Sequence, residues 1–130
     1  MQQESPAAAL VREFWRLMAS NNFTLPTQLF ADSFVLDWPQ TNERIRGREN
    51  FARLNTEYPA HGPWRFDIEA LTGDVSQAVS RVRISDGVQT ALAISFFEIE
   101  DGQITHMTEF WPEPYVPPTN RAHLTEPLAC

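Results

Sequence analysis

The stretch SFFEIEDGQITHMTEFWPEP, residues 95–114, carries the strongest fold signal in this chain. Asp101-Gly102 is typical of a two-residue hairpin turn, and the segments on both sides are rich in β-branched and aromatic residues. The sequence therefore predicts two long antiparallel strands joined at this turn. On the second strand Glu109 lies in a row of large apolar side chains, a pattern that is typical of a ligand cavity wall.

The residues before this hairpin predict two further strands. Apolar and polar residues alternate from residue 64 to residue 71, and Gly73-Asp74 leads into a second extended segment, residues 78–85. Asp86-Gly87 is another two-residue hairpin signal. Together these turns predict an antiparallel meander of four strands.

Three helices are predicted before the meander. Ser5-Pro6 begins the first, because serine is a good N-cap and proline fits the first helical position. This helix is expected to end near residues 21–22, since asparagine tolerates the left-handed conformation of a helix C-terminus. A short second helix is expected over residues 25–30, and a third over residues 47–58.

Two short strands are predicted between the second and third helices, over residues 34–38 and 43–46. Pro39 indicates that the first is a short strand or an edge strand, because proline has no N–H for a ladder bond. This order of elements predicts an α+β fold in which a curved sheet wraps around helices. Such a sheet leaves a cone-shaped space on its concave side, and this space predicts a pocket.

The last two strands are apolar on both faces. Leu92, Ile94 and Phe96 share one face, whereas Ala93 and Phe97 share the other. An antiparallel sheet with one face in water shows a cleaner alternation. Because three helices cover only one side of a sheet of this size, we predict a homodimer through the convex face.

Composition limits the class of protein. The chain has 130 residues, so we expect one domain over residues 1–130, with a proline-rich tail from about residue 112. Its net charge is −7 and it has no lysine. A surface without a net basic field does not attract nucleic acid or anionic membranes. The one cysteine, Cys130, allows neither an internal disulfide nor a cysteine-pair metal site. We therefore expect a cytoplasmic protein with no nucleic-acid or membrane partner.

Four segments carry a family resemblance: FADSFVLDWP, the ERIRG that follows it, DGQI, and EFWPEPYVPPTNRAHL. With the order of elements, they resemble the SnoaL-like branch of the NTF2-like superfamily, and WPQTNERIRGREN is similar to a subgroup of small proteins in that branch. The resemblance implies a cone-shaped fold in which three N-terminal helices pack in a strongly curved, mostly antiparallel sheet. It does not imply one reaction, because the superfamily includes polyketide cyclases, steroid isomerases, dehydratases, epoxide hydrolases and non-catalytic binding proteins.

The resemblance also implies which residues face the cavity. In the similar steroid isomerases, alternate residues of the last strand point inward, which turns Glu109 toward the cavity and His106 and Phe110 away from it. The implied ligand-binding residues are Phe14, Phe34, Leu36, Trp38, Phe51, Tyr58, Trp64, Phe66, Ser95, Phe97, Met107 and Trp111. Such a lining suits a flat or hydrophobic small molecule.

The chain departs from the steroid isomerases at their catalytic positions. The resemblance matches Trp38 to the catalytic aspartate of the isomerases. It matches Phe14 to their oxyanion tyrosine and Ser95 to their second oxyanion acid. None of these three side chains can replace the isomerase group at its position, so steroid isomerisation is not supported.

Glu109 is the candidate catalytic residue. A carboxyl group in apolar surroundings has a raised pKa, which suits it to move protons near neutral pH. Alternatively, Glu109 forms a structural ion pair with an arginine. Arg81 and Arg83 share one strand face, and either one is this partner or both are surface or dimer-interface charges on the convex side, since charges on a strand are usually solvated. Arg44 and Arg46 are either substrate clamps at the cavity mouth or solvated loop charges.

The sequence predicts no metal and no cofactor. His106 and Glu109 are three residues apart on a strand, so they face opposite ways and cannot chelate one ion together. No glycine-rich loop joins a strand to a helix, so a dinucleotide site is not indicated.

Three functions remain open from the sequence. The first is a cofactor-free acid/base enzyme acting on a small hydrophobic molecule, of the cyclase, isomerase, dehydratase or hydrolase type. The second is a non-catalytic small-ligand-binding protein, and the third is a dimeric interaction protein of the same fold.

Overall fold

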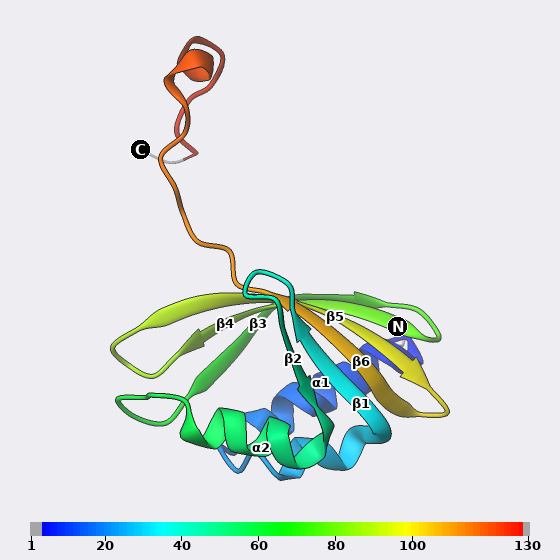
Figure 1. Cartoon of the computed structure of the whole chain (residues 1–130). Helices are drawn as coiled ribbons and strands as arrows, with labels where there is room; N and C mark the ends of the chain where they lie inside the picture. The colour runs from blue at the N-terminus through cyan, green and yellow to red at the C-terminus, as the bar shows by residue number, and fades with distance from the viewer. Residues whose placement is uncertain (1–3, 129–130) are drawn as a thin grey trace.

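A six-stranded curved sheet wraps around two α-helices in the computed structural model of the chain (Figure 1), which describes residues 4–128. Cys130 lies outside these described residues. The strand order is β2-β1-β6-β5-β4-β3. The elements are α1 (Pro6–Met18), a 3-10 helix η1 (Leu25–Leu29), β1 (Phe30–Trp38), β2 (Glu43–Arg46), α2 (Gly47–Glu57), β3 (Arg65–Gly73), β4 (Gln77–Ser85), β5 (Thr90–Glu100), β6 (Gln103–Phe110) and η2 (Thr119–Leu124).

The predicted helices are present, with one change of type. Ser5 caps α1 by accepting a hydrogen bond from the Ala8 N–H at 3.2 Å, and Pro6 occupies its first position. The helix ends at Met18, and Asn21 adopts a left-handed φ of 62° in the turn that follows. The predicted second helix is the 3-10 helix η1, so only two of the three are α-helices.

β1 corrects the interpretation of Pro39. The strand has nine residues and lies between β2 and β6, so it is neither short nor at an edge. Pro39 follows the last residue of the strand, where its missing N–H removes no ladder bond. β1 pairs with β6 in parallel, whereas every other pair of neighbouring strands is antiparallel.

The four-strand meander is confirmed, but one of its turns differs from the prediction. Asp101 and Gly102 form the two-residue turn with φ values of 52° and 75°. Asp86 instead opens a four-residue loop between Ser85 and Thr90. The Asp86 carboxylate accepts hydrogen bonds from the N–H groups of Val88 and Gln89, at 2.9 and 2.8 Å, and these bonds stabilise the longer loop.

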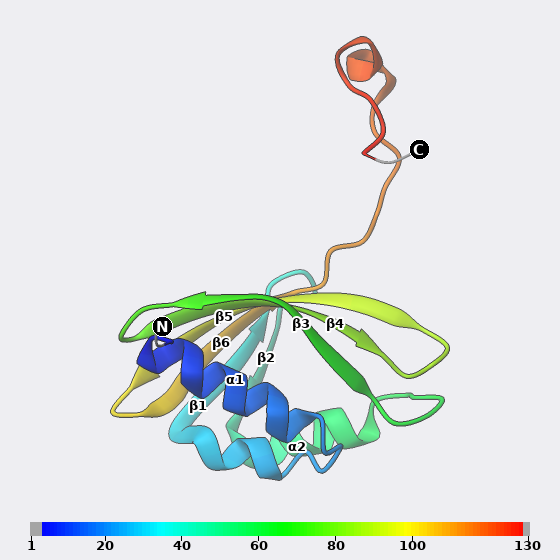
Figure 2. The same cartoon turned by 180° about the vertical axis from the view of Figure 1, so that it is seen from behind.

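The two α-helices and η1 lie on the concave side of the sheet (Figures 1 and 2). Their apolar faces form one core with the sheet, and Phe14 lies at its centre. Its ring is 4.9 Å from Trp15, 5.5 Å from Phe97 and 6.0 Å from Phe30, measured between centroids. A fully buried phenylalanine contributes about 1.5–3 kcal/mol to folding, so this cluster holds the helices to the sheet.

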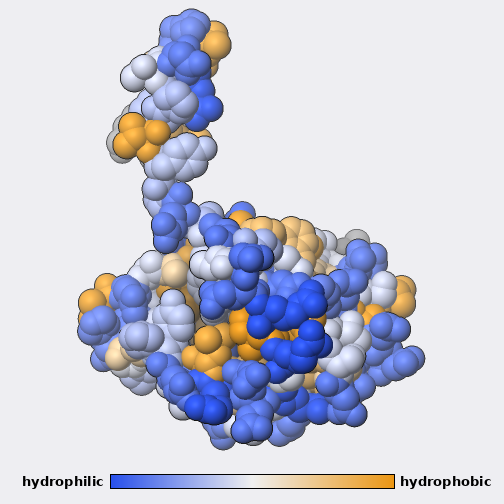
Figure 3. All heavy atoms as spheres, viewed as in Figure 1, coloured by the Kyte–Doolittle hydropathy of each residue, from blue (hydrophilic) through white to orange (hydrophobic). Residues whose placement is uncertain are grey.

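Among the described residues no helix packs on the convex side of the sheet, and the C-terminal tail, which includes η2, extends from the body on that side (Figures 1 and 2). In Figure 3 hydrophobic side chains stand out on the otherwise hydrophilic tail. Tyr115, Val116 and Leu124 are each at least three-quarters exposed there, at 80%, 89% and 76%. Within residues 4–128, no helix is long and apolar enough to cross a membrane.

Candidate functional site

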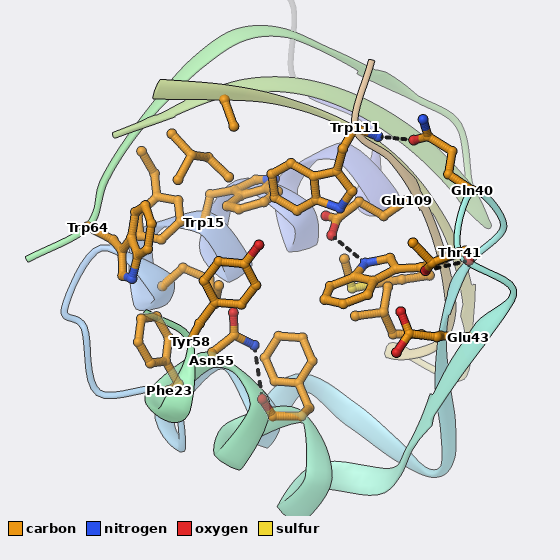
Figure 4. A pocket seen from close by; sticks show the side chains of 18 of the residues that line it. Trp15, Phe23, Gln40, Thr41, Glu43, Asn55, Tyr58, Trp64, Glu109 and Trp111 are labelled. Carbon is orange, nitrogen blue, oxygen red and sulfur yellow. Dashed lines mark hydrogen bonds between the residues drawn. The ribbon is translucent and has the colours of Figure 1, made fainter. Parts of the chain in front are cut away.

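A cavity of about 460 Å³ lies between the helices and the concave face of the sheet. Aromatic side chains dominate its wall, and Figure 4 shows Trp15, Tyr58, Trp64 and Trp111 around it. The lining residues are Phe14, Trp15, Met18, Phe23, Leu36, Trp38, Gln40, Thr41, Glu43, Phe51, Asn55, Tyr58, Trp64, Phe66, Ile84, Gln89, Thr90, Ala91, Met107, Glu109, Trp111 and Glu113.

Glu109 is the buried carboxyl group of this wall. It lies on β6, is 5% exposed, and its side chain lies beside the Trp111 ring (Figure 4). Ser95 donates its hydroxyl hydrogen to Glu109 Oε2 at 2.6 Å, and the indole N–H of Trp38 donates to Oε1 at 3.1 Å. Burial raises the pKa of Glu109, and these two hydrogen bonds oppose that rise only in part. The group therefore keeps its proton to a higher pH than an exposed glutamate does.

Strand register brings these three residues together. Ser95 of β5 is the cross-strand partner of Glu109 in the antiparallel β5–β6 ladder. β1 runs parallel to β6 with Leu36 opposite Met107, so Trp38 extends along the same side as Glu109. The strands therefore set the geometry of the site, and strands are more rigid than loops.

Buried polar residues form a row across neighbouring strands, from Ser80 through Ser95 to Glu109. Ser80 of β4 is the cross-strand partner of Ser95, and both side chains are fully buried. Ser80 accepts a hydrogen bond from the indole N–H of Trp15 at 3.0 Å, which connects α1 to this row. Every buried side-chain nitrogen and oxygen among the described residues has a hydrogen-bond partner, as expected of a stable polar network.

The structure does not support the alternative of an ion pair for Glu109. Within residues 4–128 no arginine forms a salt bridge with it. Arg81 and Arg83 instead both pair with Glu69, and both side chains are about half exposed. Arg44 pairs with Asp37 and does not line the cavity, so it is not a clamp at the mouth.

Most of the predicted ligand-binding residues line the cavity, but three do not. Phe34 stacks on Phe30 with ring centroids 3.6 Å apart, deep in the core. Phe97 is buried against Phe14, and Ser95 is buried where it contacts Glu109. Alternation assigned these three to the inner face of the sheet, but inner residues become core wherever helices pack directly on them. The predicted residues in the wall are Phe14, Leu36, Trp38, Phe51, Tyr58, Trp64, Phe66, Met107, Glu109 and Trp111.

The cavity also contains residues outside the ligand-binding set predicted from the sequence. Trp15 and Met18 lie three apart on α1, and this helical spacing was a usable signal for a shared face. Gln40 and Gln89 belong to loops, for which no periodicity exists. Gln40 also accepts a hydrogen bond from the backbone N–H of Trp111, which ties the β1–β2 loop to the end of β6.

His106 lies on the opposite face of β6, as the face assignment predicted. Its ring contacts Asp37 Oδ2 through Nε2 at 2.8 Å and Glu98 Oε2 through Nδ1 at 3.1 Å. Arg44 donates to Asp37 Oδ1 at 2.6 Å, and this bond, with a smaller contribution from His106, lowers the pKa of Asp37 to about 2 against the effect of burial. Within residues 4–128 no three His, Cys, Asp or Glu side chains are grouped as metal ligands.

Comparison with known proteins places this geometry in a family. The model of the SnoaL-like domain matches residues 11–107. A search of curated proteins returned no match. A structure from Kribbella flavida DSM 17836, described as a "putative ketosteroid isomerase", is 33% identical with a TM-score of 0.85, covering 96% of this chain and 91% of that one.

Two further structures share the fold at lower identity. An NTF2-like protein from Burkholderia xenovorans LB400 is 23% identical with a TM-score of 0.75, covering 93% of this chain and 94% of that one. An epoxide hydrolase from M. tuberculosis, described as LEH-like, is 19% identical with a TM-score of 0.66, covering 82% and 83%. The chain therefore belongs to the SnoaL-like family of the NTF2-like superfamily and has the α+β cone fold of that superfamily.

Proposed function

We propose that this SnoaL-like protein binds a small hydrophobic molecule in its cavity and exchanges a proton with it through Glu109. The observation that carries the proposal is the position of Glu109, which is buried in an aromatic wall and held by the neutral side chains of Ser95 and Trp38. A carboxyl group in such surroundings both donates and accepts protons near neutral pH.

The hydrogen bonds of Glu109 suit both halves of a proton transfer. While Glu109 is protonated, its O–H is available to a ligand group in the cavity. Once the proton has left, Ser95 and Trp38 donate to the two carboxylate oxygens and stabilise the charge. This chemistry needs no cofactor and is compatible with a cyclase, isomerase, dehydratase or hydrolase.

Steroid isomerisation is not part of the proposal, although the similar Kribbella flavida protein is described as a "putative ketosteroid isomerase". The positions that the resemblance matches to the isomerase's catalytic groups hold Phe14, Trp38 and Ser95. Phe14 is completely buried and has no polar atom in its side chain. Phe14 therefore cannot replace the oxyanion tyrosine, and Ser95 is not an acid and cannot replace the second oxyanion acid.

A non-catalytic binding protein is the second candidate function. It is favoured because Glu109 is the one buried titratable side chain among the described residues of the wall, whereas Glu43 and Glu113 are exposed. General acid/base catalysis commonly uses two groups with different pKa values. In this case Glu109 orients the ligand and no turnover occurs.

A Glu109→Gln variant separates the two functions. Ligands are first found in a library of small hydrophobic molecules by tryptophan fluorescence, because all four tryptophans of the chain line the cavity. In an enzyme, the variant loses about 10²–10⁴-fold in turnover while still binding the ligand. In a binding protein only the affinity changes.

Glu100→Gln is the matched control, since Glu100 is exposed at the end of β5 and is not part of the cavity wall. This control should retain both binding and turnover. If no hydrophobic molecule changes the tryptophan emission, the proposed function is wrong.

We also propose that two chains pair through the convex face of the sheet. Phe96 is 45% exposed there and packs edge-on against Phe110, with ring centroids 6.0 Å apart. Ile94 is the cross-strand partner of Phe110, and Val79 that of Phe96, so the apolar side chains form a continuous patch. A second copy that covered this patch would remove it from water.

A further inference from the structure

The cavity wall has an uneven distribution of charge. Glu43, Glu109 and Glu113 line it, whereas no arginine or histidine among residues 4–128 does, and the chain has no lysine. Three arginines follow Glu43 closely in the sequence, and none of them lines the cavity: Arg44, Arg46 and Arg48. Arg44 pairs with Asp37, and Arg48 pairs with Asp32. A ligand with a carboxylate or phosphate group would therefore meet only like charges here.

The aromatic residues of the wall add to this preference. The rings of Trp38 and Trp111 meet edge to face with centroids 6.4 Å apart at 85°, and those of Tyr58 and Trp64 do so at 6.1 Å and 68°. The face of an aromatic ring is electron-rich and attracts a cation, most strongly in the case of tryptophan. Rings set at steep angles around a space are the arrangement that binds alkylated ammonium groups.

Glu109 is the third feature of the wall that favours a cation. Its carboxyl group lies beside Trp111 (Figure 4) and accepts a hydrogen bond from Trp38, so it is adjacent to both indole rings. Its protein partners are neutral, and a buried carboxylate is costly without a cation. The deprotonated form of Glu109 therefore has no counter-charge from the described residues, and a cation that enters the cavity would supply one.

We propose that this cavity takes an organic cation, a tertiary or quaternary alkylammonium group on an apolar body, with its nitrogen held by Glu109, Trp38 and Trp111. The inference names the ligand class of the site proposed above and rests on that proposal. A tertiary amine that enters uncharged takes the Glu109 proton, so that an N–H bond forms as the O–H bond breaks. A quaternary cation instead makes Glu109 release its proton to solvent.

A matched pair of probes tests the charge alone. Benzyltrimethylammonium and neopentylbenzene have the same shape, with a quaternary nitrogen in the first where the second has carbon. We expect the cation to bind the wild-type protein at least about tenfold more tightly at pH 8, by tryptophan fluorescence, because a desolvated cation–π contact and an ion pair both favour it. Its affinity should also rise with pH, because Glu109 must lose a proton on binding.

The variants locate the preference. Glu109→Gln should bind neopentylbenzene as the wild type does but lose most of the preference for the cation, whereas Glu100→Gln should keep the preference. Equal affinity of the wild type for both probes overturns the cation inference and leaves the hydrophobic-ligand proposal standing. A preference that is undiminished in Glu109→Gln, or is lost equally in Glu100→Gln, also overturns it, because Glu109 would then not be the group that holds the cation.

If neither probe binds, the cation inference is wrong. The wider library of neutral molecules then decides the proposed function separately.

Discussion

Ser95 and Glu109 stand opposite each other in the β5–β6 ladder, and the Ser95 hydroxyl oxygen lies 2.6 Å from Glu109 Oε2. The serine is fully buried, so its hydroxyl group has little access to water. This pair places a hydrogen-bond donor behind the carboxyl group, on the side away from a ligand. It makes Ser95 a positioning residue for Glu109.

Replacement of Ser95 by alanine should raise the pKa of Glu109 further. The variant loses the stronger of the two hydrogen bonds that oppose the effect of burial, while Trp38 still donates to Oε1. A ¹³C NMR titration of the Glu109 carboxyl carbon measures this shift.

Ser80→Ala is the control for that titration. It removes the acceptor of the Trp15 indole N–H and leaves a buried donor unpaired, which costs about 1–3 kcal/mol of stability. The pKa of Glu109 should be the same in this variant as in the wild type. An unchanged Glu109 pKa in Ser95→Ala would mean that the serine does not stabilise the carboxylate.

The Glu109→Gln variant should gain stability over the wild type as pH rises. The folded-state pKa of Glu109 is raised above its ordinary value of 4.5, so its favourable contribution is complete below that pH and is lost as pH rises through the folded-state pKa. Glutamine does not titrate, so the difference in free energy of unfolding should grow in its favour between about pH 4 and pH 8. Urea unfolding at these two pH values measures the difference in free energy of unfolding between the variant and the wild type. A difference that is the same at both pH values would contradict the raised pKa of Glu109.

Asp37→Asn should show the opposite dependence on pH. The pKa of Asp37 is lowered to about 2 from 3.8, so its contribution is present above the ordinary value and is lost as pH falls through about 2. The ion pair with Arg44 is partly exposed, so the variant should lose less than about 1 kcal/mol near neutral pH. Urea unfolding over this range should show the difference fading toward pH 2.

Asp32→Asn serves as its control. The Asp32 side chain is 97% exposed in its pair with Arg48, and fully exposed ion pairs contribute little. Its free energy of unfolding should match that of the wild type at every pH. If Asp32→Asn lost as much stability as Asp37→Asn, the destabilisation in both variants would come from the change in net charge.

Phe96→Asp should separate the proposed dimer. An aspartate in the apolar patch would be buried without a partner in the interface, which costs several kcal/mol of association free energy. Sedimentation velocity at micromolar concentration should show the wild type as a dimer and the variant as a monomer with an unchanged circular dichroism spectrum. A wild-type protein that sediments as a monomer of about 14.9 kDa would refute the dimer.

The sequence by itself determined the local features of this protein. The Asp101-Gly102 turn follows from two residues that tolerate positive φ, and the start of α1 follows from Ser5-Pro6. Alternation along β6 also indicated that Glu109 and His106 face opposite ways, because a strand reverses its side chains at every residue. These features depend on neighbours in the chain, so they are readable without a structure.

The tertiary structure alone decided how deep each inward-facing residue lies and what it contacts. Phe34 and Phe97 face inward but are core, since helices and neighbouring strands cover them. The partners of Glu109 are Ser95 and Trp38, 14 and 71 residues away, and not the arginine that the sequence left open. Strand register and helix packing set such contacts, and these depend on residues distant in the chain.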